Sequence, residues 1–204
     1  MDHVEDLDEV DFGAANVEGN ARITGALGAV IFVLLLVEGL TIPGVGGHIT
    51  IHVVVGMLLV AFVAAKIATT SYRFARYYSG QRAYVAKGPP PRVLRVLGPF
   101  VTVLTVAVLA TGIAAVLDTG GSRLIVFAHK ASFVLWFVAM TVHVLGHALE
   151  TPVLAFADWR RARRRQAPGA AARFAALGVA LAVAVVLGVV SMGWAHAWQH
   201  LHFR

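Results

Sequence analysis

Histidines that lie inside long apolar segments are the residues of this sequence best suited to chemistry. The chain has nine histidines and no cysteine, which excludes disulfides, thiolate zinc sites, iron–sulfur clusters and covalently attached c-type haem. Any metal chemistry must therefore rest on imidazole nitrogens. An ionisable side chain within a membrane span is costly, so it is a functional candidate by default. The histidines in such segments are His52, His129, His143 and His147.

The positions of these histidines suit a haem held between packed helices. His52 and His129 lie at similar depth, near the same end of two segments expected to run in the same direction. Their imidazoles can therefore face each other and supply the two axial donors of a haem iron. His143 follows His129 by 14 residues, which returns to nearly the same helix face about 21 Å further along. That separation suits two haems stacked across a bilayer.

The composition indicates a membrane protein. Hydrophobic residues make up 58% of the chain and charged residues 14%, with a mean hydropathy of +0.76, whereas a soluble domain carries about 25% charged residues. We predict an all-α membrane bundle with an acidic, disordered tail at residues 1–20, a four-helix haem-binding core within 21–158, and a fifth span within 159–204. The expected spans are Arg22–Ile42, His48–Tyr72, Leu97–Leu117, Ser122–Leu154 and Phe174–Ala195.

Two basic loops set the expected orientation. With five spans both loops lie on one side, which the positive-inside rule makes the cytoplasmic side. The N-terminus is then cytoplasmic and the C-terminus outside, in the cell (inner or plasma) membrane. The loops also account for the net charge of +6, so nucleic acid is not an expected partner. Their basic residues are Arg73, Arg76, Arg82, Lys87, Arg92 and Arg95, and Arg160, Arg161, Arg163, Arg164, Arg165 and Arg173.

The histidine pattern resembles a known family. The motif His52-Val-Val-Val-Gly56, with His129 and His143, is similar to the four-helix membrane cytochrome b subunits of formate dehydrogenase and nickel–iron hydrogenase, in the cytochrome b561-type group. The resemblance, over about residues 22–150, implies that His52 and His129 bind an outer haem b and that Gly56 makes room for the porphyrin. It also implies that His143 binds an inner haem with a histidine of the first helix. Gly25 stands in that histidine's place, so we expect about one haem per chain.

These features predict an integral membrane b-type cytochrome that carries electrons between the quinone pool and a partner redox protein or larger respiratory complex. We expect an electron-transfer subunit rather than a stand-alone enzyme, because no G-x-G-x-x-G motif opens a soluble βαβ unit for flavin or nicotinamide. The alternative is a non-haem membrane protein, either a small transporter or an assembly factor, that keeps the scaffold without the cofactor. In that case the histidines would hydrogen-bond neighbouring helices.

Two polar residues at the depth of the inner haem have more than one interpretation. His143 could be a ligand, a quinone hydrogen-bonding group or a remnant. Lys66 follows His52 by 14 residues and so lies on the same face near the depth of His143. Its ammonium group could snorkel to the cytoplasmic surface or pair with a haem propionate.

Other polar residues lie one helical turn from the predicted ligands. His48 and His147 are at i, i+4 spacing from His52 and His143, and we expect them to be interfacial polar groups, with His48 the substitute if His52 is misassigned. Glu38 could form a structural pair with Lys130. Alternatively, the Glu38 carboxylate could accept the proton released when a quinol is oxidised beside the outer haem.

Overall fold

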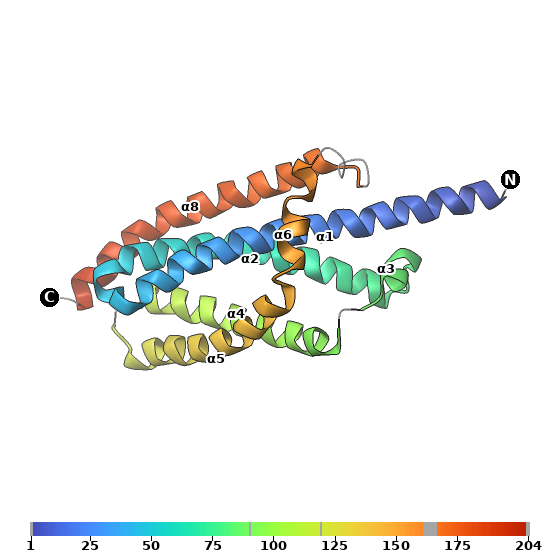
Figure 1. Cartoon of the computed structure of the whole chain (residues 1–204). Helices are drawn as coiled ribbons and strands as arrows, with labels where there is room; N and C mark the ends of the chain where they lie inside the picture. Colours follow the sequence, from blue (N-terminus) through green and yellow to red (C-terminus); the bar gives the residue numbers. More distant parts are fainter. Residues whose placement is uncertain (1, 90, 119, 161–166, 203–204) are drawn as a thin grey trace.

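The computed structural model describes residues 2–89, 91–118, 120–160 and 167–202, with side chains from residue 13 to 198 within these ranges. These residues form helices joined by short turns and contain no strand, so the all-α prediction is confirmed for this part of the chain (Figure 1). The elements are α1 (Asp2–Thr41), η1 (Ile42–Gly44), α2 (Val45–Tyr78), α3 (Arg82–Lys87), α4 (Arg92–Leu117), α5 (Arg123–His147), α6 (Glu150–Ala155), η2 (Ala157–Trp159) and α8 (Ala170–His202).

Four helical stretches are long and apolar enough to cross a membrane. The first covers 66 residues, Gly13–Tyr78, and a straight helix of that length would measure about 99 Å, far more than the about 30 Å of a bilayer core. It is not straight, because Pro43 and Gly44 form the short 3₁₀ turn η1. The chain reverses there, so that α1 and α2 lie antiparallel (Figure 1). Among the described residues the long helices of the bundle are therefore α1, α2, α4, α5 and α8.

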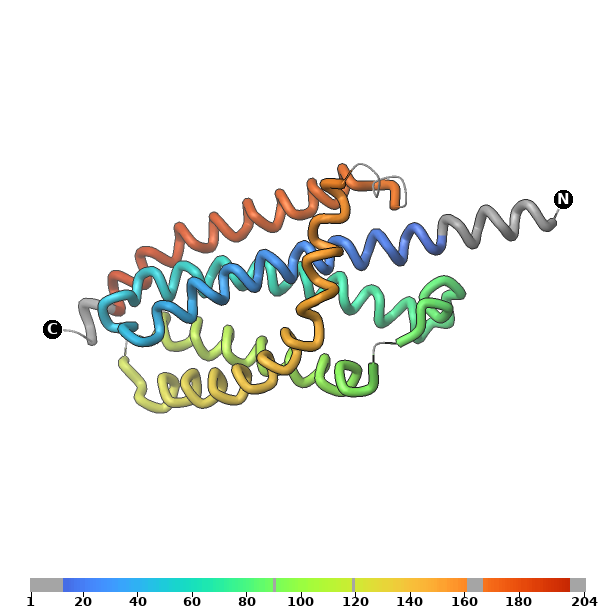
Figure 2. The backbone as a smooth tube through the Cα atoms, viewed as in Figure 1, coloured from blue at the N-terminus to red at the C-terminus, as the bar shows by residue number. Residues whose placement is uncertain are grey.

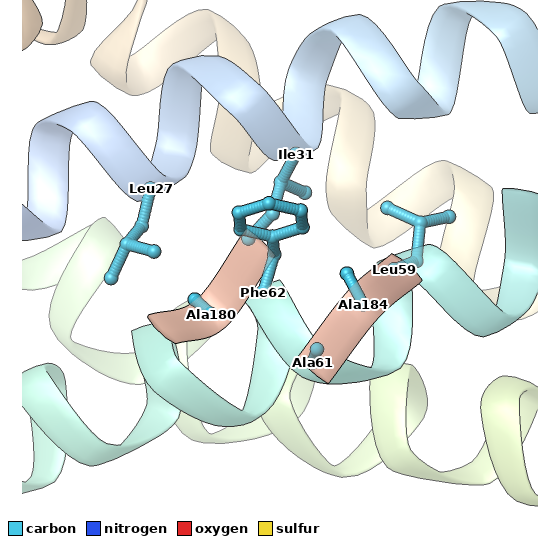
Figure 3. Packing of buried hydrophobic residues seen from close by; sticks show 7 residues of the cluster. All are labelled: Leu27, Ile31, Leu59, Ala61, Phe62, Ala180 and Ala184. Atoms are coloured by element: carbon cyan, nitrogen blue, oxygen red, sulfur yellow. The ribbon is translucent and has the colours of Figure 1, made fainter. Parts of the chain in front are cut away.

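The core of the bundle lies where α2 packs against both α1 and α8. Alanines on α8 and α2 let the helices approach closely around the side chains of Leu27, Leu59 and Phe62 (Figure 3). Gly188 of α8 lies against Leu58, whose Cδ2 would be 3.3 Å from a Cβ at that position. Small residues at helix interfaces are typical of membrane proteins, in which close packing takes the place of hydrophobic burial. α2 is therefore the central helix of the bundle.

The hairpin of α4 and α5 forms the other side of the bundle. Trp136 Nε1 donates a 2.9 Å hydrogen bond to Thr105 Oγ1 across the hairpin, and Leu94 fills the space beside Gly146. α5 packs chiefly against α4. The outward faces of the lengthwise helices carry exposed apolar side chains, which are compatible with contact with lipid. Examples are Phe100, Phe127, Leu135, Leu145 and Val186.

The fourth predicted span ends earlier than expected. The prediction ran it to Leu154, but α5 ends at His147, and α6 crosses the bundle over α1 to reach the start of α8 (Figure 2). The physical reason is Pro152, which has no backbone N–H to continue the α5 hydrogen-bonding pattern back to Ala148. The crossing brings Leu154 against Gly25 of α1, where a Cβ would lie 2.6 Å from the Leu154 Cβ.

An ion cluster fastens this crossing segment to α1 and α8. Arg22 Nη1 donates a 3.0 Å hydrogen bond to Asp158 Oδ1, and its Nε lies 2.9 Å from Glu18 Oε1. Arg173 of α8 binds the same Asp158 carboxylate through Nε and Nη2. The side chains of Arg22 and Asp158 are buried. One carboxylate therefore joins three segments that are far apart in sequence.

The structure has residues 2–20, for which we predict a disordered tail, in helix α1, which begins at Asp2. Two small and polar residues of this stretch contact neighbouring helices. A Cβ at Gly13 would lie 2.9 Å from Ala83 Cβ of α3, and Asn20 Nδ2 donates a 3.1 Å hydrogen bond to the Thr69 carbonyl of α2. Met1 lies outside the described residues.

We expect Asp158→Asn to lower the free energy of unfolding by about 3 kcal/mol, because it leaves two arginines without their shared buried anion. The hydrogen bonds from Arg173, followed by those from Arg22, hold the pKa of Asp158 below its usual value. This contribution is therefore fully present above the ordinary aspartate pKa of about 4 and is lost as the pH falls through the lower pKa of the folded protein. Both effects can be measured by thermal unfolding of the detergent-solubilised protein from about pH 3 to about pH 7, an interval that includes the ordinary pKa of aspartate.

The matched control is Glu150→Gln, because the Glu150 side chain is 63% exposed. It should leave the unfolding temperature within the error of the wild-type value. Equal unfolding temperatures for Asp158→Asn and wild type at neutral pH would contradict the role of the ion cluster.

Candidate functional site

The structure brings two of the predicted site residues together. The imidazole rings of His52 on α2 and His129 on α5 have centroids 6.3 Å apart and planes at 78° to each other. They lie in the half of the bundle that contains η1 and the turn between α4 and α5. The structure therefore places these two side chains next to each other, as the sequence predicts.

Hydrogen-bond acceptors on α1 determine which nitrogen of His52 carries the proton. Thr41 Oγ1 lies 2.8 Å from His52 Nδ1 and donates its only hydrogen to the Glu38 carbonyl at 2.6 Å. Because that hydrogen is used, Thr41 can only accept a hydrogen bond from His52. Glu38 Oε1 lies 3.2 Å from the same nitrogen. Nδ1 is therefore the donor, and the lone pair of the neutral ring is on Nε2.

His129 is held in the same tautomer by the neighbouring helix α4. Its Nδ1 lies 3.1 Å from the carbonyl oxygen of Val108, which can only accept a hydrogen bond. Thr111 Oγ1 lies 3.3 Å from the same nitrogen and 3.1 Å from Ser132 Oγ. His129 therefore also presents the lone pair of Nε2.

The distance between the paired rings is that expected of two axial ligands. Given a metal–nitrogen bond of about 2 Å, two imidazoles on opposite sides of one iron have ring centroids about 6 Å apart. The 6.3 Å separation agrees with that value. Metal-binding histidines commonly donate their other ring N–H to a carboxylate or a backbone carbonyl, and these are the groups found beside His52 and His129. The residues present thus fit a six-coordinate haem.

Two glycines make room around the pair, in different ways. A Cβ at Gly112 of α4 would lie 3.0 Å from His129 Cε1, so glycine is needed for the ring to lie against that helix. A Cβ at Gly56, which we expected to face the porphyrin, would instead lie 3.4 Å from Glu38 Oε1. The nearest group to Gly56 is thus the carboxylate beside His52.

Sequence reasoning missed the residues that orient the ligands: Thr41, Val108, Thr111 and Gly112. Threonines in apolar helices are common and mostly bond their own backbone, as Thr102 and Thr141 do here. The available signal was weak: Thr41 and Thr111 are polar residues at the depth of the predicted ligands. The carbonyl of Val108 could not be found from its side chain.

The structure distinguishes the two interpretations of Glu38 in part. Its carboxylate faces His52, and among the described residues no ion pair joins it to Lys130. His48 lies apart from the pair, with an exposed side chain whose Nδ1 is 2.9 Å from the Gly44 carbonyl. His48 is therefore no substitute for His52.

The predicted inner position has a different character. His143 Nδ1 is buried and has no hydrogen-bond partner among the described residues, and its ring lies 4.8 Å from that of His147. Lys66 Nζ donates a 3.0 Å hydrogen bond to the Thr24 carbonyl of α1. Because Leu154 covers Gly25, no side chain of histidine size fits there. The structure therefore gives His143 no opposing imidazole from α1.

No protein-family model matches the chain, and the comparisons with curated proteins and with solved structures also give no match. The proposals that follow therefore rest on the residues and their geometry.

Proposed function

We propose that the chain is an integral membrane b-type cytochrome that holds one haem b between His52 and His129. It passes single electrons between the quinone pool and a partner redox protein or larger respiratory complex. The observation that carries the proposal is the pair of imidazoles with centroids 6.3 Å apart, each with Nδ1 engaged by a partner on a neighbouring helix. Two neutral rings with free Nε2 lone pairs are the donor set that a low-spin haem iron requires.

Each residue of the site has a defined part in this function. A bound haem would supply one-electron exchange at its iron. His52 and His129 would hold it, and Thr41 and the Val108 carbonyl keep the rings in the tautomer that leaves Nε2 free to bind a metal. Gly112 lets the His129 ring lie against α4.

The site lies at the η1 end of the bundle, which the basic loops make the outer side of the cell membrane. The proposed haem is therefore near the outer face. Because His143 has no second ligand opposite it, we expect no second haem at its level. Electrons would then have no cofactor to carry them over the distance of about 21 Å between the levels of His129 and His143. Exchange with quinone or a partner protein is thus proposed at the outer side.

Replacing His52 or His129 by Ala should abolish most of the low-spin haem spectrum of the purified protein, because one remaining imidazole leaves at best a five-coordinate site. Absorption spectra of oxidised and reduced protein, expressed with haem supplied, measure the effect. His48→Ala is the matched control, since His48 is one turn from His52 and its side chain is exposed, and it should keep the full spectrum.

Circular dichroism of each variant separates loss of haem from loss of fold. Retention of the wild-type spectrum by folded His52→Ala and His129→Ala would rule out the ligand assignment. A colourless but folded wild-type protein would favour the alternative of a small transporter or assembly factor.

A pyridine haemochrome assay should return about one haem per chain, because Leu154 occupies the place of an opposing ligand at Gly25. His143→Ala should leave both the stoichiometry and the spectrum unchanged. Two haems per wild-type chain, falling to one in His143→Ala, would overturn the single-haem assignment.

Quinol analogues test the electron donor. We expect a lipid-soluble quinol to reduce the haem in proteoliposomes, because the site lies between membrane helices. Reduction by a water-soluble partner alone, with no response to quinol, would remove quinone from the proposal and leave the haem assignment standing.

A further inference from the structure

The carboxylate of Glu38 is placed unusually for a residue in a membrane helix. It lies between α1 and α2 with its side chain 17% exposed, and Oε1 is 3.2 Å from His52 Nδ1. Its Oε2 is buried with no hydrogen-bond partner among the described residues. A carboxyl group within an apolar span is costly to maintain. Thr41 Oγ1 also lies within hydrogen-bonding distance of His52 Nδ1. It would be a sufficient acceptor for this N–H without the carboxylate.

We propose that Glu38 is a positioning residue that orients His52 and lowers the reduction potential of the haem. The inference rests on the proposed function, because it concerns the ligand of that same haem. It assigns to Glu38 a role that acts through His52 rather than through contact with the iron.

The two acceptors at His52 Nδ1 have different strengths. Thr41 is a neutral hydroxyl whose own hydrogen is bound to the Glu38 carbonyl. The Glu38 carboxyl group, when ionised, is the stronger acceptor, because hydrogen bonds to ionised groups are roughly twice as strong as neutral ones. An acceptor at one nitrogen of an imidazole raises the basicity of the other nitrogen. Nε2 of His52 therefore becomes a better donor, which stabilises the ferric iron relative to the ferrous iron.

The opposite ligand has no such group. Nδ1 of His129 faces the Val108 carbonyl and the Thr111 hydroxyl, both neutral. The carboxylate is therefore specific to one side of the site. It is also the side to which α1 contributes, so that α1 orients a ligand carried by α2.

The local sequence lets the carboxylate reach the imidazole. Position 56, one turn after His52, is glycine, and a Cβ there would lie 3.4 Å from Glu38 Oε1. A Cβ at that distance is in ordinary contact, whereas a side chain longer than that of alanine at position 56 would have to share the space that the carboxylate now fills. The small residue at position 56 thus leaves room for the group that orients His52.

The test uses the haem-loaded wild type, Glu38→Gln and Thr41→Val at one fixed alkaline pH, at which the Glu38 carboxyl group is ionised. Glu38→Gln keeps the size and a carbonyl oxygen but removes that charge. It should raise the equilibrium constant for haem reduction roughly tenfold, the ordinary difference between a charged and a neutral partner, which is a rise of about 59 mV in midpoint potential for one electron. Spectroelectrochemical titration measures the shift. Thr41→Val should shift the potential in the same direction by less.

Electron paramagnetic resonance of the ferric protein tests the orienting role of Glu38. A charge that acted only at a distance would leave the orientation of the His52 ring unchanged. The g-values of low-spin haem depend on the planes of the axial rings, so Glu38→Ala should change them more than Glu38→Gln does. Glu150→Gln is the control, because Glu150 is an exposed carboxylate. It should leave both the potential and the g-values unchanged.

The outcomes separate this inference from the proposed function. An unchanged or lower potential in Glu38→Gln, with the haem spectrum intact, would overturn the role of Glu38 and leave the cytochrome assignment standing. If Glu38→Gln does not fold, Thr41→Val decides, and an unshifted potential in that variant overturns the inference. A wild-type protein that binds no haem would instead overturn the proposed function, and this inference with it.

Discussion

In an apolar bundle a neutral histidine must place its N–H on an acceptor, and the site depends on where those acceptors lie. His52 and His129 each find one on the helix next to their own, at Thr41 with Glu38 and at the Val108 carbonyl. The acceptors fix the tautomers, and the tautomers fix which nitrogen is free to bind a metal. If the acceptors met Nε2 instead, the same two histidines would carry their free lone pairs on Nδ1.

The arrangement of the helices follows from the same pairs of neighbours. α1 orients His52 on α2, and α4 orients His129 on α5, so that each hairpin carries one of the two histidines together with its acceptor. The hairpin of α1 and α2 is further supported by α8, through the core around Leu59 and Phe62. α5 packs chiefly against α4, so a cofactor bound between the histidines would add contacts between the two hairpins. Ligand binding and bundle stability should therefore be coupled.

The two ends of the bundle differ because of the crossing of α6. At the η1 end, Gly112 gives space to an imidazole. At the α3 end, Leu154 closes the space beside Gly25, and Lys66 is bound to a backbone carbonyl. The ion cluster of Arg22, Asp158 and Arg173 holds the crossing segment in this place. The closed space beside Gly25 and the path of α6 are thus parts of one local arrangement.

The sequence by itself determined the long apolar helices and which two histidines could meet, because apolar length and helical periodicity depend only on residue type and spacing. It did not determine where α1 begins or the early end of α5 before Pro152. Only the tertiary structure decided which groups meet Nδ1 of each histidine, since Thr41, Glu38 and the Val108 carbonyl belong to neighbouring helices. A backbone carbonyl leaves no trace in the sequence, and the rotation of one helix against another depends on the packing of all its neighbours.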